Sequence, residues 1–279
     1  MNNITGVNAD TMFKRIGVAW ERLDIGTGRD LGEVRVAVRR GMHVLPVFTG
    51  GTLGSLQGLS SAQAAADVAS LAPRLNRLGI RTLEFGNEVY RFLAARRYAA
   101  LYDAAHRAAA GRLVLLAPAT TDYYEQARGG KGSWFRDLAA TLPGRAAEID
   151  ALTLHPYGSM TRLCGDGYGW SMLTRLHAES VRAGFRWWLP WYITEVGQEI
   201  WGGGLECQPP VSRAVQADDV TQYLNDVADR YPWVVFLALY TSRDDETGGF
   251  GLLTSNNSPR PAFRALAEWV AAAVPRTAG

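Results

Sequence analysis

Two short stretches decide the fold: Leu83–Glu88, with the sequence LEFGNE, and Tyr192–Gly197, with the sequence YITEVG. Each brings an apolar run of strand length to a glutamate, Glu88 in the first stretch and Glu195 in the second. When strands and helices alternate around a barrel, the carboxyl ends of the strands meet on one face, so glutamates far apart in sequence can lie side by side. The two stretches therefore predict a barrel that carries a pair of carboxylates on that face.

Apolar runs of strand length alternate with helix-periodic segments along the rest of the chain. The expected strands are 4–8, 18–25, 42–48, 80–85, 112–118, 151–157, 187–194 and 233–240. The expected helices are 32–40, 60–78, 94–110, 134–147, 171–183, 216–230 and 263–274. About eight strands, each followed by a helix or a helical turn, predict a (β/α)8 TIM barrel, an α/β fold, with residues 1–279 as a single domain.

The composition is that of an ordinary globular protein able to bury a sizeable core, with 47% hydrophobic and 20% charged residues. A balance of 29 Lys and Arg against 27 Asp and Glu gives a net charge of +2, so no nucleic-acid partner is expected. No stretch approaches the roughly 20 apolar residues of a membrane span. A doubly wound open sheet is the main alternative fold, but no GxGxxG or Walker-type loop supports nucleotide binding.

The histidines and cysteines give no metal signature. Four histidines and two cysteines occur without CxxC or HExxH spacing, so we expect no metal and no cofactor. Cys164 and Cys207 fall in loops expected on the same face of the barrel, where a disulfide and two free thiols are equally compatible with the sequence. The first six residues lack the features of a signal peptide, which indicates an extracellular location if a leader was removed and a cytoplasmic one otherwise. We expect a monomer.

Each glutamate motif is weak evidence alone, because a polar pair between a strand and a helix often only caps that helix. Their occurrence together, at the ends of the fourth and seventh expected strands, is more informative. Two carboxylates placed across a sugar bond are the minimal machinery of glycoside hydrolysis.

The motifs resemble those of the clan A glycoside hydrolases, whose barrels carry an acid/base glutamate after an asparagine on strand four and a nucleophilic glutamate on strand seven. Gly86-Asn87-Glu88 resembles the acid/base motif and Ile193–Gly197 the nucleophile motif, most like family 39 and its relatives, with family 5 next. The resemblance spans nearly the whole chain. It departs from the family pattern at Val89, where relatives commonly have proline.

The resemblance implies that Glu88 protonates the leaving oxygen and later activates water, while Glu195 attacks the anomeric carbon and is kept ionised by donors. The configuration would be retained, which requires carboxyl groups about 5 to 5.5 Å apart, against about 6.5 to 9.5 Å in inverting enzymes. Asn87 is expected to bind the sugar 2-hydroxyl. Arg22 resembles the arginine that holds the nucleophile charged, although an ion pair with a neighbouring acidic residue, Asp24 or Glu84, is the alternative.

Side chains near the other strand ends are candidates for supporting roles. Tyr157 is expected to orient the nucleophile, and His155, on the same face of its strand, either contacts sugar or is a satisfied core residue. Sugar rings stack on aromatic side chains, which makes Tyr240 a candidate platform and Trp201 and Trp170 candidates for outer subsites. Three further tryptophans are expected to pack in or around the seventh strand: Trp187, Trp188 and Trp191.

These observations predict a retaining glycosidase that acts on a β-linked polysaccharide or oligosaccharide. Loops 158–169 and 197–213 decide between endo and exo action, of which endo is preferred. The main alternative is a catalytically silent carbohydrate-binding barrel, because the same aromatic side chains would bind glycan without turnover. A metal-dependent hydrolase is the third alternative, but this chain lacks histidine-rich strand ends.

Overall fold

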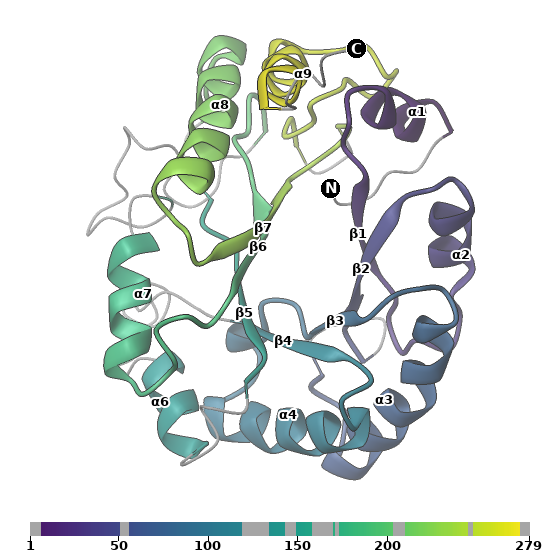
Figure 1. The fold of residues 1–279 in the computed structure, drawn as a ribbon, viewed down its shortest axis with the longest axis vertical. Helices are drawn as coiled ribbons and strands as arrows, with labels where there is room; N and C mark the ends of the chain where they lie inside the picture. Colours follow the sequence, from purple (N-terminus) through teal and green to yellow (C-terminus); the bar gives the residue numbers. More distant parts are fainter. Residues whose placement is uncertain are drawn as a thin grey trace, which may run out of the picture.

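Seven parallel strands form the centre of the described part of the molecule and follow one another in chain order. The computed structural model describes residues 7–50, 56–118, 134–142, 149–157, 170, 173–202, 210–244 and 248–273. The strands are β1 (Trp20–Asp24), β2 (His43–Phe48), β3 (Thr82–Phe85), β4 (Val114–Pro118), β5 (Ala151–Leu154), β6 (Trp191–Val196) and β7 (Val234–Leu239). Because β1 also approaches β7, the sheet curves into a nearly closed barrel (Figure 1).

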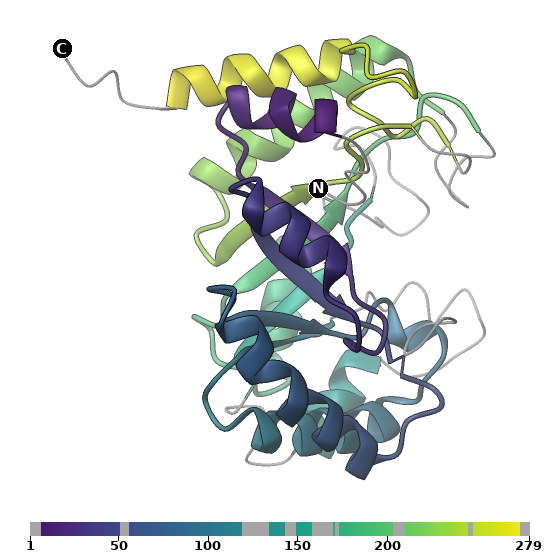
Figure 2. The ribbon, with the colours of Figure 1, turned by 90° about the vertical axis from the view of Figure 1, so that its right-hand side faces the viewer.

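Helices alternate with the strands and cover the outside of the sheet (Figure 1). They are α1 (Val7–Arg15), α2 (Gly32–Arg39), α3 (Ser61–Asn76), α4 (Ala95–Ala109), α6 (Trp134–Thr141), α7 (Leu173–Arg182), α8 (Arg213–Asp229) and α9 (Pro261–Ala273), with a short 3₁₀ helix η1 (Val89–Arg91) after β3. Figure 2 shows α9 across one end of the molecule with α1 beneath it. Each helix returns the chain to the same end of the sheet, so the carboxyl ends of the strands lie together.

The predicted α/β barrel is confirmed, but the first expected strand, 4–8, is wrong where it can be compared. Val7 and Asn8 belong to α1, and residues 4–6 lie outside the described residues. The helix is favoured because it buries Phe13, whose ring packs edge-on against Phe263 of α9. The strand that precedes Glu88 is consequently the third described strand, β3, and the strand that carries Glu195 is β6.

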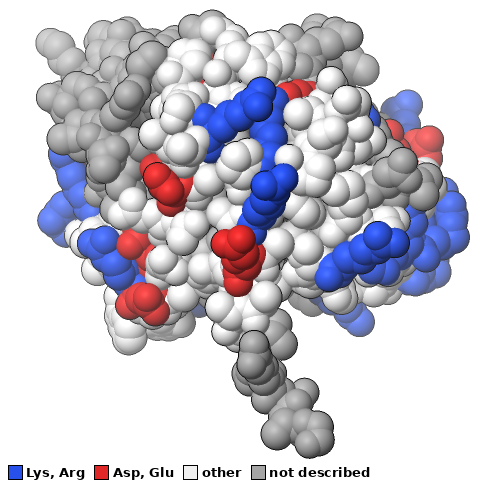
Figure 3. All heavy atoms as spheres, turned by 90° about the horizontal axis from the view of Figure 1, so that it is seen from above, with Lys and Arg blue, Asp and Glu red and all other residues white. Residues whose placement is uncertain are grey.

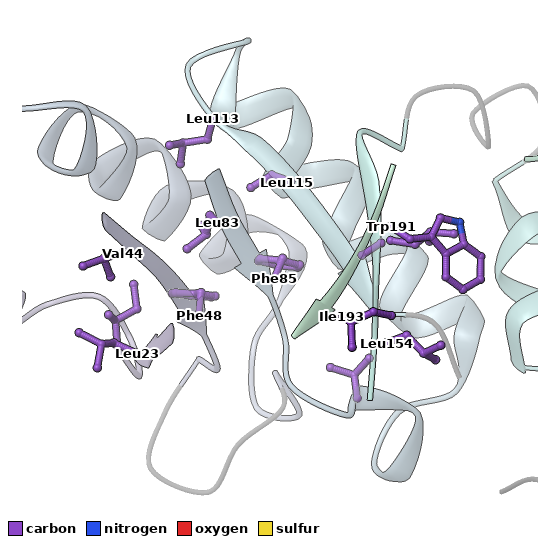
Figure 4. Packing of buried hydrophobic residues seen from close by; sticks show 14 of the residues in the cluster. Leu23, Val44, Phe48, Leu83, Phe85, Leu113, Leu115, Leu154, Trp191 and Ile193 are labelled. Atoms are coloured by element: carbon purple, nitrogen blue, oxygen red, sulfur yellow. The ribbon is translucent and has the colours of Figure 1, made fainter. Parts of the chain in front are cut away.

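The main hydrophobic core lies between the sheet and the helices. Because side chains alternate along a strand, one set from each strand points outward; Figure 4 shows members of this set, including Leu23, Phe85, Leu115 and Ile193, in one cluster. The rings of Phe48 and Phe85 stack with centroids 5.6 Å apart. A second, smaller cluster is formed by residues of the opposite alternation: Leu45, Leu116 and Ala151, with Tyr192 and Phe236 against them.

The tryptophans before β6 differ from the prediction. The strand begins at Trp191, which is buried, whereas Trp187 and Trp188 lie in a turn and are more than half exposed. The expectation that all three pack in or around the strand is therefore wrong for two of them. The turn is held by the ring nitrogen Nε2 of His177 on α7, which lies 2.9 Å from the carbonyl oxygen of Trp187.

The surface agrees with the even charge balance of the sequence. Figure 3, which looks onto the end of the molecule that carries α1, α8 and α9, shows basic and acidic side chains scattered over uncharged surface on that face. None of the helices in the described ranges is both long and apolar enough to span a bilayer.

Candidate active site

A buried ion pair forms the base of the candidate site. Glu84 on β3 is 1% exposed, and its Oε2 accepts a hydrogen bond from Nε of Arg22 on β1 at 2.6 Å. The same guanidinium donates from Nη1 to Oε1 of Glu195 at 2.6 Å and from Nη2 to Oδ1 of Asn87 at 2.7 Å. Arg22 therefore makes both of the contacts that the sequence offered as alternatives: it pairs with Glu84 and also with Glu195. Asp24 instead accepts from the backbone N–H of Gly26 and the hydroxyl of Thr49.

An irregularity in β6 brings Glu195 into the barrel. Regular alternation would place Glu195 on the outward side with Ile193, but the register between β6 and β7 shifts between Ile193 and Val196. Thr194 and Glu195 consequently both reach inward: the hydroxyl of Thr194 donates to Glu84 at 3.1 Å and Glu195 accepts from Arg22. Irregularities of this kind re-aim side chains and are frequent beside active sites.

A tight turn after β3 places Glu88. Gly86 has φ +95°, and a Cβ there would lie 2.4 Å from Cγ1 of Val89, so the turn requires glycine. Glu88 itself has the left-handed conformation, φ 45° and ψ 38°, which is uncommon outside glycine. It occupies the N-cap position of η1, yet its side chain makes no cap hydrogen bond. The Glu88 carboxylate therefore does not cap η1, although capping is the common role of a polar pair at this position.

His155, just beyond β5, joins the two glutamates. Its Nδ1 lies 3.3 Å from Oε1 of Glu88 and 3.6 Å from Oε2 of Glu195. On the other side of the ring, Nε2 lies 3.0 Å from Oγ1 of Thr194 and 3.9 Å from Oε1 of Glu84. The structure therefore brings Glu88 and Glu195, which are 16% and 12% exposed, to the same imidazole nitrogen.

The electrostatics of this cluster follow from the packing of two cationic groups among carboxylates. Burial disfavours the charged form of His155, but the carboxylates of Glu195, Glu84 and Glu88 outweigh it and raise the pKa of His155 from 6.5 to about 9. Burial likewise opposes the charge on Glu84, but Arg22 and His155 outweigh it and lower the pKa of Glu84 to about 2. The pKa of Arg22 is raised because Glu84 and Glu195 outweigh the effect of its own burial.

Tyr157 contacts the second oxygen of the nucleophile candidate. Its hydroxyl donates to Oε2 of Glu195 at 2.5 Å, and burial, together with the negative charge of Glu195, raises the Tyr157 pKa well above 10. Glu195 therefore accepts from Arg22 on one oxygen and from Tyr157 on the other. The structure shows this contact, and the orienting role of Tyr157 stays a prediction.

Tyr240, which follows β7, forms an aromatic wall beside this tyrosine. The rings of Tyr240 and Tyr157 meet edge to face with centroids 5.9 Å apart, and Phe250 packs against both. The peptide bond between Tyr240 and Thr241 is cis. Gly197 lies so close that a Cβ there would be 2.1 Å from the carbonyl oxygen of Tyr240, which explains the need for glycine at the end of the Ile193–Gly197 motif.

The remaining candidates lie in different surroundings. Trp170 is fully buried: its ring packs at a tilt against Tyr223 and its Nε1 donates to Asp226, so the predicted role as an outer sugar subsite is wrong. Trp201, just after β6, is 45% exposed and remains a candidate. Cys164 and Cys207 lie outside the described residues, as do loop residues 158–169 and 203–209.

Sequence reasoning misses two members of the cluster. It presents Glu84 only as an alternative partner for Arg22, and it gives Thr194 no role. A signal for Glu84 exists, because a charged residue between Leu83 and Phe85 faces the opposite side from its apolar neighbours and needs a partner when buried. For Thr194 no comparable signal exists, since threonine is common in strands.

Metal binding has no support in the part of the chain that is described. No group of three or more His, Cys, Asp or Glu side chains is arranged there to hold a metal ion.

Comparison with known proteins adds information at the level of the fold. No protein-family model and no curated protein sequence matches the chain. Among solved structures, a GH5_18 protein from Bifidobacterium longum matches with a TM-score of 0.65 over 97% of this chain and 74% of that chain, at 16% identity. The fold is that of the TIM-barrel glycosidases.

Other solved glycosidases share it. A β-D-glucuronidase of Dictyoglomus thermophilum matches with a TM-score of 0.60 at 16% identity, over 95% of this chain and 46% of that one. A GH2 β-galacturonidase from Eisenbergiella tayi, bound to galacturonate, matches with a TM-score of 0.64 at 11% identity, over 96% and 48%. The chain thus spans less than half the length of these two enzymes. Family 5, predicted second, is represented by the Bifidobacterium protein; the likeness to family 39 stays a prediction.

Proposed function

We propose that the protein is a retaining glycoside hydrolase that cleaves a β-linked polysaccharide or oligosaccharide, with Glu88 as acid/base and Glu195 as nucleophile. The observation that carries the proposal is the convergence of these two glutamates on Nδ1 of His155, at 3.3 Å and 3.6 Å. Shared fold alone would not carry it, because one barrel fold hosts many functions. The chemistry rests on the side chains.

The spacing of the carboxylates supports retention. Two oxygens that lie 3.3 Å and 3.6 Å from one atom cannot be farther apart than the sum of these distances. That upper limit falls near the lower end of the range of about 6.5 to 9.5 Å typical of inverting enzymes, and any bent arrangement about the nitrogen brings the oxygens closer to the range of about 5 to 5.5 Å typical of retaining ones.

In the first step, a carboxylate oxygen of Glu195 attacks the anomeric carbon while the bond to the leaving oxygen breaks. The proton of Glu88 moves to that oxygen, and a glycosyl ester of Glu195 forms. Arg22 and Tyr157 hold the attacking carboxylate in a fixed orientation, because each donates to one of its oxygens. This fixed orientation lowers the entropy cost of reaching the reactive geometry.

In the second step, Glu88 is a carboxylate and removes a proton from a water molecule. The water oxygen attacks the anomeric carbon, the ester bond breaks, and Glu195 is released as a carboxylate. Arg22 holds Asn87 by its Oδ1, so the amide group turns its Nδ2 donors in another direction. That orientation suits a hydrogen bond to the sugar 2-hydroxyl, which strengthens as the transition state develops positive charge.

Aromatic rings near the two glutamates suit a sugar ring, whose apolar face stacks on aromatic side chains. Tyr240 would form the platform at the cleavage point, and Trp201, which is 45% exposed, would form an outer subsite. Matching proteins act on or bind β-glucuronides, galacturonate and Manβ1-4GlcNAc, so uronides and β-mannosides belong in the first substrate panel. Endo action on a chain is the preferred mode.

The test measures new reducing ends from β-glucans, xylan, mannan, uronic-acid polymers and β-linked oligosaccharides. The wild type is compared with Glu195→Gln and with Glu179→Gln, a control that changes an exposed helical ion pair to Arg175 on α7. Release from one substrate by the wild type and the control, but not by Glu195→Gln, supports the proposal. Binding of a glycan with no release contradicts it and indicates a silent carbohydrate-binding barrel.

A further inference from the structure

The charges in the site do not balance unless one of the two catalytic glutamates is ionised. Arg22 and His155 supply two positive charges, and Glu84, which the buried pair keeps ionised, supplies one negative charge. One more negative charge makes the cluster neutral. A charge left uncompensated in so buried a place is strongly unfavourable. The fixed groups therefore favour the state in which just one of Glu88 and Glu195 carries a charge.

His155 is placed to serve either glutamate. The same Nδ1 faces Oε1 of Glu88 at 3.3 Å and Oε2 of Glu195 at 3.6 Å. Its Nε2 is held from the other side by Thr194 Oγ1 at 3.0 Å, and the Thr194 hydroxyl donates onward to Glu84. The ring is thus anchored at one nitrogen, while the other faces both catalytic carboxylates.

We propose that His155 is a shared counter-cation that balances the charge of Glu195, 3.6 Å from its Nδ1, in the free enzyme and the charge of Glu88, 3.3 Å from the same nitrogen, in the glycosyl-enzyme. This inference rests on the proposed function and assigns His155 a positioning role that the sequence did not predict. When Glu195 becomes an ester, its negative charge is lost, and at the same moment Glu88 gains one by giving its proton to the leaving oxygen. His155 keeps its own proton and changes partner, so the total charge of the cluster is constant.

All titratable groups that face His155 in the described residues bear on this assignment. Glu88 and Glu84 approach from the β3 side and Glu195 from β6, while Arg22 on β1 acts against the imidazolium charge. Tyr157 lies edge-on with ring centroids 6.4 Å away, and burial, followed by Glu195, keeps its hydroxyl neutral by raising its pKa. Glu84 lies 3.9 Å from Nε2, farther than the other two glutamates lie from Nδ1, and the Thr194 hydroxyl contacts both Nε2 and Glu84.

The experiment reads the charge of the His155 ring at pH 7 by NMR of isotope-labelled histidine, in the wild type, Glu88→Gln, Glu195→Gln and the double variant. Either glutamate alone is expected to suffice, so His155 stays protonated in the wild type and in both single variants. In the double variant both direct partners are gone and burial dominates, so the ring becomes neutral. Glu195→Gln removes the same charge that ester formation removes and therefore mimics the second state.

Two results would overturn the inference. If His155 stays protonated in the double variant, Glu84 alone holds its proton and the ring is no shared partner. If one single variant already neutralises the ring, only that glutamate pairs with it. The signals of His43, His106 and His177 should be unchanged in all four proteins, which verifies that the variants fold.

The measurement uses no substrate, so it is independent of the hydrolase test. An inactive protein with the expected histidine pattern would reject the proposed function and keep the shared pairing. An active enzyme whose double variant keeps the imidazolium would reject the shared pairing and keep the function. In an active enzyme, His155→Gln should in addition slow both formation and hydrolysis of the glycosyl-enzyme, because the ring serves both steps.

Discussion

Arg22 and Glu84 form an ion pair with 2.6 Å between Nε and Oε2, and both side chains are almost wholly buried. Removing one partner of such a pair leaves the other charge without compensation, which commonly costs about 3 to 5 kcal/mol. Because Arg22 keeps Glu195 as a partner, we expect Glu84→Gln to lower the free energy of unfolding by about 3 kcal/mol. Urea denaturation measures the change.

Glu179→Gln on α7 is the matched control for that variant, because it removes the same charge from an exposed pair with Arg175. Exposed helical pairs contribute only about 0.3 to 0.5 kcal/mol, so its midpoint should hardly move. Equal stability of Glu84→Gln and Glu179→Gln would show that Glu84 does not anchor the site.

The sequence predicts which residues form this site better than it predicts the strand geometry that brings them together. The glutamates stand out because each ends an apolar run, and alternation along β1 places Arg22 inward. Glu195 reaches the site only through the irregularity of β6, which depends on how β6 pairs with β7 and not on the sequence of β6 alone. The alternation rule by itself would have placed Glu195 on the outer face with Ile193.

The wrong prediction for Trp170 has a different cause. Both Trp170 and Trp201 are candidates by sequence because they follow strands, yet the ring of Trp170 is buried against Tyr223 in the core. Tryptophan supplies a large apolar surface equally well to a core and to a binding site, so residue type cannot choose between them. The start of the chain shows the same limit: Val7 and Asn8 suit a strand by pattern, but the packing of Phe13 against α9 favours a helix.

His155 makes stability depend on pH. Its folded-state pKa of about 9 exceeds the ordinary value of 6.5, so its contribution is complete below pH 6.5 and is lost as the pH rises through about 9. Across this window the free energy of unfolding should fall with a slope of at most about 1.4 kcal/mol per pH unit. The lowered pKa of His177 acts below pH 6.5, outside the window.

The check is a series of urea denaturation curves from pH 6.5 to pH 9 for the wild type and His155→Gln. The difference in unfolding free energy between the two proteins should shrink as the pH rises, since other groups that titrate in the window contribute equally to both. If this difference in unfolding free energy stays constant, His155 is already neutral in the folded protein at pH 6.5.

Tyr157→Phe tests the orientation of Glu195, the proposed nucleophile. The variant removes one hydrogen bond to Glu195, and hydrogen bonds to charged groups contribute about 1.5 to 3 kcal/mol. On any substrate found, kcat/KM should fall by roughly 10- to 100-fold. Tyr102→Phe is the control, because it removes a buried hydroxyl that donates to the backbone of Leu115 and makes no hydrogen bond to Glu195. Tyr102→Phe should cost stability and leave kcat/KM unchanged. If kcat/KM is instead unchanged in Tyr157→Phe and falls in Tyr102→Phe, Tyr157 does not belong to the site.

Gly197→Ala tests the close approach of the chain after β6 to Tyr240. The added Cβ would lie 2.1 Å from the carbonyl oxygen of Tyr240, so the two segments must separate, and we expect a loss of about 1 to 3 kcal/mol in stability together with reduced activity. Gly58→Ala is the control, since nothing lies within 4 Å of the position that a Cβ would take there and its φ is not in the left-handed region. Thermal unfolding and product release measure both variants, and equal behaviour would show that the approach is not needed.

Glu88 combines a left-handed backbone with a carboxylate at the centre of the site, and the two can be separated by comparing Glu88→Gly with Glu88→Ala. Both variants lack the carboxyl group and should be inactive. A residue with a Cβ pays about 1 to 2 kcal/mol in the left-handed region, whereas glycine does not. After the greater chain entropy of unfolded glycine is deducted, Glu88→Gly should be more stable than Glu88→Ala by roughly 1 kcal/mol. Thermal unfolding decides. If Glu88→Gly is the more stable variant, glutamate occupies a position where glycine folds better, so its presence is explained by chemistry and not by stability. If Glu88→Ala is the more stable variant, only Gly86 needs the conformational freedom of glycine in this turn.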